Sequence, residues 1–428
     1  MGTGVLKPAF PRGDAGLTAG RVALADLAEH YGTPLYVYDA EIVRNRYDAV
    51  VHAFAGADPL VAYSVKANGT LALLHLLARL GAGADIVSGG ELFRALRAGV
   101  PASRIVFAGV GKTEAEIVSA LEAGILAFNV EGAEELDRIE ASAARLGVRA
   151  GIAVRVNPDV LSPTPHEYTR TGHADTKFGV SLADTPALYR RAARSDHLDP
   201  IGIDMHIGSQ ITSPEPYARA LEQTLHVVDA LAREGIALRF FDLGGGFGVS
   251  YDGGPAMPLG DLASVVVPPV RARGLSLILE PGRFLVAEAG VLVTRVLGIK
   301  KGARKRFVIT DGGMTELLRP SHYGGYHVIE SVTRADGREP EPVDVVGPIC
   351  ETGDFLARDR SLPLPDVGEL LAVRTVGAYG FTMASNYNAR RRPAEVMVDG
   401  RRVDLIRTRE TFEDLVRGEQ IPDEAPLT

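Results

Sequence analysis

The chain has 428 residues, of which 46% are hydrophobic and 23% are charged, as is typical of a soluble globular protein with room for two domains. The formal net charge is −8 and the lysines and arginines form no basic stripe, so we expect no nucleic-acid partner. No apolar stretch reaches the length of a membrane span, and no signal-peptide pattern begins the chain. The only cysteine, Cys350, can form neither an intrachain disulfide nor a cysteine metal site, and we expect a cytoplasmic protein.

The first 60 residues predict a short helix at 22–28, a strand at 34–38 and a helix from 40 to about 54. A regular alternation of strands and helices then begins. Strand-like runs lie at 60–65, 84–87, 105–107, 126–130, 149–156, 201–205, 238–243 and 275–280, and the segments between them have helical spacing. Eight successive strand–helix units predict an α/β fold with a (β/α)8 barrel of the TIM type. An open, doubly wound sheet is the alternative, and the even spacing of the repeats favours closure.

After Arg283 the pattern changes to short β-rich runs separated by Gly, Pro and Asp. These runs lie at 290–297, 306–310, 343–346, 370–376, 395–398 and 402–406. They predict a second, antiparallel β domain resembling a sandwich or barrel. We therefore expect a barrel domain at 40–285 and a β-rich domain formed by 1–39 together with 286–428.

Lys66 lies at the carboxyl end of the first predicted barrel strand, where parallel α/β folds place their chemistry. Desolvation lowers the pKa of a lysine, and the neutral amine forms Schiff bases with aldehydes such as pyridoxal phosphate. The alternative is a lysine that extends to the rim of the barrel. The position of Lys66 alone favours this alternative, so the residues at the other strand ends must decide between the two roles.

Polar groups or glycines follow most of the other predicted strands, namely Ser88, Asn129, Asn157, His206, Gly244–Gly246 and Glu280. A glycine run exposes backbone N–H groups, and barrels commonly bind phosphate after strands seven and eight. If pyridoxal phosphate binds there, Glu280 is placed to pair with its ring nitrogen. The alternatives are a flexible turn for the glycine run and a salt bridge between Glu280 and Arg283.

Further candidates lie outside these strand ends or admit several roles. His206 is either structural, a base or a group that stacks on a cofactor ring, and the neighbouring strand-end groups favour stacking. Histidines and carboxylates show no paired ligand spacing, so no metal site is expected. Cys350 lies in a polar, turn-rich stretch, where a thiol with a pKa near about 8.5 can donate a proton to a carbanion. Arg319 and Tyr323 suit carboxylate recognition, and Tyr379 suits phosphate. A solvated surface position is the alternative for these three residues.

Taken together, the chain resembles the fold-type III pyridoxal-phosphate decarboxylases, and among them the diaminopimelate decarboxylases. The resemblance covers roughly residues 20 to 415. The matching motifs are Tyr63–Asn68, His166–Tyr168, Thr171–His173, Thr176–Gly179, His206–Gln210, Gly244–Gly248, Glu280–Arg283, Asp311–Met314, Arg319–Tyr323, Cys350–Asp354 and Gly377–Pro393.

The resemblance implies roles for individual residues. Lys66 would form the Schiff base with pyridoxal phosphate, and Cys350 would protonate Cα after carbon dioxide leaves. The other implied cofactor-binding residues are His206, Ser209, Gly244, Gly245, Gly246, Glu280, Gly282, Arg283 and Tyr379. The implied substrate-binding residues are Arg283, Arg319, Tyr323, Glu351 and Tyr379. The resemblance also implies a homodimer in which the Cys350 stretch reaches the partner's active site.

The implied reaction is decarboxylation of meso-2,6-diaminopimelate to L-lysine, the last step of lysine biosynthesis. Arg283, Arg319 and Tyr323 would bind the distal carboxylate of this small amino-acid substrate, a lining unsuited to ornithine or arginine. A decarboxylase for another carboxylated diamino acid, such as carboxynorspermidine, stays open. So does a homologue that binds pyridoxal phosphate without catalysis, although Lys66 and Cys350 are both present.

Overall fold

The computed structural model describes residues 9–160, 176–333 and 337–422. These residues form two compact units. The first contains Asp39–Gly290 and Thr375–Thr382, and the second contains Phe10–Tyr38, Val291–Arg374 and the chain from Met383 onward. Within the described ranges, no helix is long and apolar enough to cross a membrane.

The first unit is a closed barrel of eight parallel strands. They are β5 (Leu60–Ser64), β6 (Gly83–Ile86), β7 (Ile105–Phe107), β8 (Ala127–Val130), β9 (Ala150–Asn157), β11 (Leu198–Met205), β12 (Phe240–Asp242) and β13 (Ser276–Leu279). Each pairs with the next, β13 pairs with β5, and β8 pairs with β9, so the sheet closes and the open-sheet alternative is wrong. A two-residue strand, β10 (Val180–Ser181), pairs with β9 on the outside of this order.

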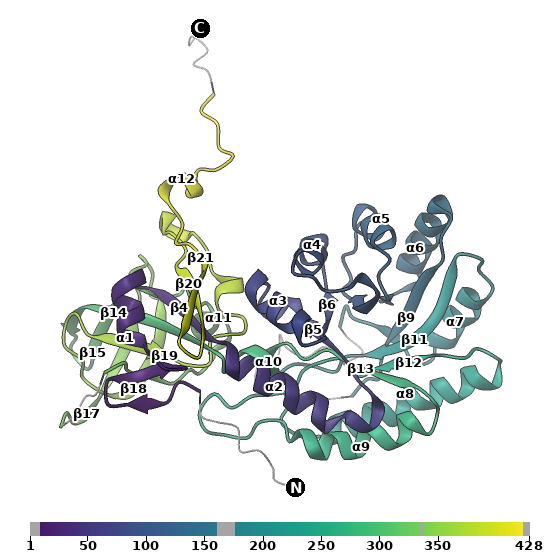
Figure 1. Ribbon diagram of the computed structural model, residues 1–428, viewed down its shortest axis with the longest axis horizontal. Coiled ribbons are helices and arrows are strands. Elements are labelled where there is room, and N and C mark those ends of the chain that lie inside the picture. Colours follow the sequence, from purple (N-terminus) through teal and green to yellow (C-terminus); the bar gives the residue numbers. More distant parts are fainter. Residues whose placement is uncertain (1–8, 161–175, 334–336, 423–428) are drawn as a thin grey trace. The chain divides into compact units, whose positions relative to one another are not determined.

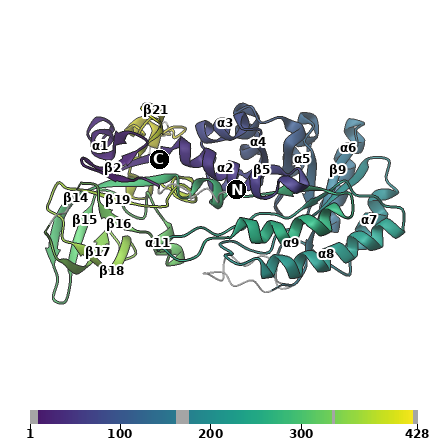
Figure 2. The same ribbon diagram turned by 60° about the horizontal axis from the view of Figure 1, so that its bottom comes forward.

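Helices cover the outside of the ring (Figure 1). They are α2 (Ala40–Ala53), α3 (Leu71–Arg79), α4 (Gly89–Arg97), α5 (Glu114–Ala123), α6 (Ala133–Leu146), α7 (Thr185–Ala193), α8 (Glu215–Arg233), α9 (Leu259–Arg271) and the short α10 (Arg283–Val286). Figure 2 shows α8 and α9 on one side of the strands and α3 to α5 on the other. Small and branched apolar side chains such as Ala62, Val106 and Ile278 fill the interior. This packed interior fixes the carboxyl ends of the strands relative to one another.

The second unit is built on a sheet in the order β18-β17-β15-β14-β4-β20-β21, with β19 paired to β14 and β16. The strands are β4 (Leu35–Asp39), β14 (Gly290–Lys301), β15 (Arg306–Thr310), β16 (Ile329–Ser331), β17 (Pro340–Val346), β18 (Phe355–Pro363), β19 (Leu370–Val373), β20 (Ala394–Asp399) and β21 (Arg402–Arg407). The expectation of purely antiparallel pairing is wrong at one place, because β15 pairs with β17 in parallel. The connection between these two strands contains α11 (Arg319–Tyr323) and β16, which gives it the length that a parallel crossover needs.

The remaining elements of this unit lie near its chain ends. A small antiparallel sheet contains β1 (Arg12–Gly13), β2 (Gly16–Ala19) and β3 (Val22–Ala23). Two short helices are α1 (Leu24–Tyr31) and α12 (Phe412–Leu415). The helix predicted at 22–28 therefore begins two residues later, after a strand pair.

Candidate active site

Lys66 lies in a single 3-10 turn, Val65–Ala67, directly after β5. Its ammonium donates to Asp85 Oδ2 of β6 at 2.6 Å, and the Ser64 hydroxyl donates to the same oxygen. The turn is tied to the 375–382 segment of the same unit, because the Tyr379 N–H donates to the Ala67 carbonyl at 2.8 Å. Lys66 therefore occupies a fixed position at the carboxyl end of the barrel, beside a completely buried carboxylate.

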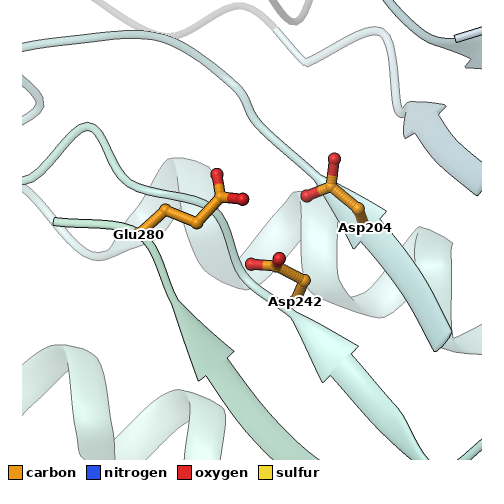
Figure 3. Close-up of side chains that lie close together, drawn as sticks. All are labelled: Asp204, Asp242 and Glu280. Carbon is orange, nitrogen blue, oxygen red and sulfur yellow. The ribbon is translucent and has the colours of Figure 1, made fainter. Parts of the chain in front are cut away.

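Three more carboxylates meet at neighbouring strand ends. Asp204 is the penultimate residue of β11, Asp242 is the last residue of β12 and Glu280 directly follows β13. One oxygen of each lies within 4.8 Å of the others. Figure 3 shows the three side chains pointing toward one another. The Asn129 amide of β8 donates to Glu280 at 3.2 Å and to Asp242 at 3.4 Å. We call Asp204, Asp242 and Glu280 the carboxylate cluster; all three are at most 4% exposed.

Burial and neighbouring charges both shift the pKa values of these groups. Burial lowers the pKa of Lys66, but Asp85 and Glu280 raise it more, so its net pKa lies above the ordinary value. The lowered pKa predicted from desolvation alone is wrong, because the charges of Asp85 and Glu280 outweigh the effect of burial. Burial, reinforced by Asp242 and Asp85, raises the pKa of Glu280 well above the ordinary range. Burial also raises the pKa of Asp242 to about 6. The carboxylate cluster therefore retains protons at a pH where exposed carboxyl groups are ionised.

The glycine run after β12 packs directly against the strand end that carries Glu280. A Cβ on Gly245 would lie 2.1 Å from the Glu280 carbonyl oxygen, and one on Gly246 would lie 2.2 Å from the Gly208 carbonyl oxygen. The Gly245 N–H donates to Nδ1 of His206 at 3.2 Å, so this nitrogen is an acceptor. Burial, with Arg155 and Lys66, lowers the pKa of His206 well below its ordinary value. His206 is thus a neutral ring held beside the glycine run.

Arg283 begins α10 and is held by polar and aromatic groups of the same unit. It donates to the Tyr251 hydroxyl at 2.6 Å and to the Ser209 hydroxyl at 3.1 Å. Its guanidinium carbon also lies 4.8 Å from the centre of the Tyr379 ring, which is cation–π distance. These contacts orient the Arg283 guanidinium within the barrel unit.

Cys350 and Glu351 lie in the second unit and are both exposed. Exposure of Cys350 agrees with the polar sequence around it and contradicts the buried-cysteine alternative. Asp354 shapes the loop: its carboxylate accepts from the Ile349 N–H at 2.6 Å and from the Met314 N–H at 2.7 Å. The thiol is therefore presented on a loop closed by a buried carboxylate.

Arg319 and Tyr323 occupy the first and last positions of α11 in the second unit. Arg319 is only 8% exposed, which contradicts a freely solvated side chain. Its Nη1 lies 2.9 Å from Nε2 of His327, a completely buried histidine that the sequence analysis did not single out.

Several residues of these sites had a detectable signal in the sequence and were missed. Asp85, Asp204 and Asp242 each interrupt an apolar strand, and a charged residue inside a buried strand requires a partner. Tyr251 and His327 carry no such signal, because each lies in an irregular segment. Two predicted strand-end side chains bind the backbone instead: the Ser88 hydroxyl accepts from the Glu91 N–H at 3.2 Å, and the Asn157 side-chain oxygen Oδ1 accepts from the Asp159 N–H at 3.0 Å. The motifs His166–Tyr168 and Thr171–His173 lie outside the described residues.

Comparison with known proteins agrees with this geometry. The family profile described as "Pyridoxal-dependent decarboxylase, pyridoxal binding domain" matches residues 40–287. A diaminopimelate decarboxylase of Pseudomonas aeruginosa is 49% identical over 96% of this chain and 99% of its own length. One of Neisseria meningitidis serogroup A is 51% identical over 92% of this chain and 96% of its own.

A solved structure extends the similarity to the fold. The crystal structure of diaminopimelate decarboxylase from Helicobacter pylori complexed with L-lysine has a TM-score of 0.89 and 42% identity, covering 92% of this chain and 98% of that one. The likeness therefore spans both units and not the barrel alone. The chain belongs to the pyridoxal-dependent decarboxylases and, among them, to the diaminopimelate decarboxylase family.

Proposed function

We propose that this protein decarboxylates meso-2,6-diaminopimelate to L-lysine and carbon dioxide. The observation that carries the proposal is the position of Lys66 beside Asp85, in a barrel that also places a glycine run and Glu280 at its strand ends. Pyridoxal phosphate is the cofactor of the family, and these residues fit it. A lysine suits its aldehyde, a run of small residues suits its phosphate, and a buried carboxylate suits its ring nitrogen.

Each of these residues would act on a separate part of the cofactor. Lys66 would bind the aldehyde carbon, and Asp85 Oδ2, 2.6 Å from Nζ, would accept the proton that the ammonium must lose. Gly244, Gly245 and Gly246 would hold the phosphate, with Ser209, Gly282 and Tyr379 as further cofactor contacts. His206 would stack on the ring and Glu280 would bind the ring nitrogen.

When bound, pyridoxal phosphate supplies the electron sink for the charge left on Cα as carbon dioxide departs. Cys350 would then deliver a proton to Cα from its thiol. Arg283, Arg319 and Tyr323 would bind the distal carboxylate, and Glu351 the distal ammonium. A substrate without the distal carboxylate would lose its contacts with these residues, so ornithine and arginine should be rejected.

We also propose that the protein is a cytoplasmic homodimer in which Cys350 of the partner subunit serves the barrel site. This arrangement is carried over from the family resemblance. Exposure of Cys350 and Glu351 is consistent with residues that act on a surface completed by another subunit.

The test is a substrate panel. The purified protein with pyridoxal phosphate is incubated separately with meso-diaminopimelate, L-ornithine, L-arginine and carboxynorspermidine, and carbon dioxide and amine products are measured. We expect lysine from diaminopimelate alone, and none from a Lys66→Ala variant. Release from ornithine or arginine would refute the distal-carboxylate argument. Release from carboxynorspermidine alone would replace the proposed substrate, and release from no compound would overturn the proposed activity.

A further inference from the structure

We infer that His327 is a positioning residue for substrate recognition, because it holds Arg319 in the orientation that binds the distal carboxylate. This inference rests on the proposed role of Arg319 in substrate binding. It assigns a function to a residue that takes no part in the chemistry and lies in the second unit.

The two ring nitrogens of His327 have different roles that their partners determine. A guanidinium can only donate, so Nε2, 2.9 Å from Arg319 Nη1, must be an acceptor. The Arg374 carbonyl can only accept, so Nδ1, at 2.8 Å from it, must carry the hydrogen. His327 is therefore neutral, with its proton on Nδ1. A protonated ring could not accept from Arg319.

The far side of the ring is anchored to the sheet. Ile329 of β16 pairs with Val373 of β19, and the Arg374 N–H continues this ladder by donating to the Val328 carbonyl at 2.9 Å. The carbonyl of the same residue, Arg374, then receives the Nδ1–H of His327. The position of the imidazole is thus set by the backbone of β16 and β19, which are rigid compared with a free side chain.

The near side of the ring contacts the long side chain of Arg319. An arginine loses rotamer entropy when it is fixed, and fixing it before the ligand arrives removes that cost from binding. The Arg319–His327 contact also leaves the guanidinium charge intact, since a neutral imidazole accepts the bond. His327 can therefore orient Arg319 without replacing the carboxylate of the substrate.

A merely structural role for His327 predicts different results from a positioning role. The experiment measures the dissociation constant of L-lysine, the product that keeps the distal carboxylate, by calorimetry on the holoenzyme. Cadaverine, which has the same amines and no carboxylate, is measured in parallel. The variants are His327→Phe, His327→Gln, Arg319→Met and the double variant His327→Phe/Arg319→Met. The control is His75→Gln, because His75 Nδ1 also lies 2.9 Å from a carbonyl oxygen, that of Ala98 in the barrel unit.

We expect His327→Phe to weaken lysine binding about tenfold, the effect of losing one hydrogen bond to a charged group. His327→Gln, which offers both an acceptor and a donor, should recover part of this loss. In the Arg319→Met background, His327→Phe should have no further effect, since the two residues act through one contact. Turnover should show a raised KM and a kcat within about twofold. The affinity for cadaverine should be unchanged in the variants, and His75→Gln should bind lysine with wild-type affinity.

The outcomes separate this inference from the proposed function. If Arg319→Met leaves lysine affinity unchanged, the proposed role of Arg319 is refuted, and the inference falls with it. If Arg319→Met weakens binding while His327→Phe does not, or if the two effects add, the inference alone is overturned. Equal weakening of lysine and cadaverine would also overturn it, because a general distortion does not depend on the carboxylate. If His327→Phe does not fold, the comparison passes to His327→Gln: a partial loss of lysine affinity with unchanged cadaverine affinity supports the inference, and an unchanged lysine affinity refutes it.

Discussion

Replacing Asp242 by asparagine should stabilise the protein and do so in a pH-dependent way. Burial raises the pKa of Asp242 from 3.8 to about 6. The folded state therefore keeps a proton that the unfolded chain has already lost, and the stability this proton contributes is complete below pH 3.8 and is lost as the pH rises through about 6. A shift of this size corresponds to about 3 kcal/mol of unfolding free energy.

An asparagine at this position imitates the protonated aspartic acid. Its side-chain oxygen can still accept from the Gly244 N–H, which lies 2.9 Å from Asp242 Oδ1. We therefore expect Asp242→Asn to raise the free energy of unfolding by about 3 kcal/mol at pH 8 and by less than about 1 kcal/mol at pH 4. The measurement is urea unfolding of the protein without cofactor, followed by circular dichroism across this pH range. Asp261→Asn, an exposed position on α9, is the matched control and should change little at either pH.

Two results would refute the reasoning. A gain that is the same at pH 4 and pH 8 would mean that the substitution acts through packing and not through ionisation. A loss of stability at pH 8 would mean that the carboxylate is stabilised by its neighbours more than it is destabilised by burial. Neither result is compatible with a raised pKa for Asp242.

Three further changes test other parts of the barrel. Gly245→Ala places a Cβ 2.1 Å from the Glu280 carbonyl oxygen, 1.3 Å short of an ordinary 3.4 Å contact, so turnover should fall about a hundredfold. Gly260→Ala, with open space around it, is the control and should retain turnover. Burial raises the pKa of Glu91 to about 7, so its ionisation should lower the free energy of unfolding by about 2–3 kcal/mol between pH 5 and 8. Denaturant unfolding of Glu91→Gln should lack this decrease. Lys112→Met should lower the free energy of unfolding by about 3–5 kcal/mol in thermal or urea unfolding, since it leaves the buried Glu135 without its partner at 2.7 Å. The double variant Lys112→Met/Glu135→Leu should lose less stability, and a larger loss would contradict this explanation.

The barrel could be predicted because its signal is local. Each strand is a short apolar run bounded by helical spacing, and the glycine after a helix, such as Gly124 or Gly147, takes the left-handed conformation that ends it. Closure followed from the number and spacing of the repeats. The β-rich unit was predicted less well, because its pairing joins strands far apart in the chain. β18 was not predicted, and the parallel β15–β17 pair depends on a long connection that no short window reveals.

The same division applies to the site. Lys66 and Glu280 could be found because a polar group directly after an apolar strand is visible from its neighbours in sequence. The carboxylate cluster could not be assembled in this way, because Asp204 and Asp242 lie 76 and 38 positions before Glu280 and meet only when the barrel closes. The role of His327 depends on its contact with Arg319 and on the carbonyl of Arg374, 47 positions away in the chain. Such contacts are set by tertiary packing and leave no periodic pattern.

The carboxylate cluster suits the binding of a cation, which in the proposed function is the protonated ring nitrogen of the cofactor. Burial raises the pKa values of Asp242 and Glu280, and for Glu280 the charges of Asp242, Asp85 and Asp204 add to this effect. Ionised carboxylates at this position, where one oxygen of each lies within 4.8 Å of the others, therefore destabilise the protein. In the proposed role of Glu280, a positively charged ring nitrogen would favour the ionised form, so its binding would displace protons from the cluster and recover part of that energy. Asp242→Asn lowers the negative charge at this position. The substitution should therefore stabilise the empty protein and weaken its hold on the ring nitrogen, two opposite effects with one electrostatic cause.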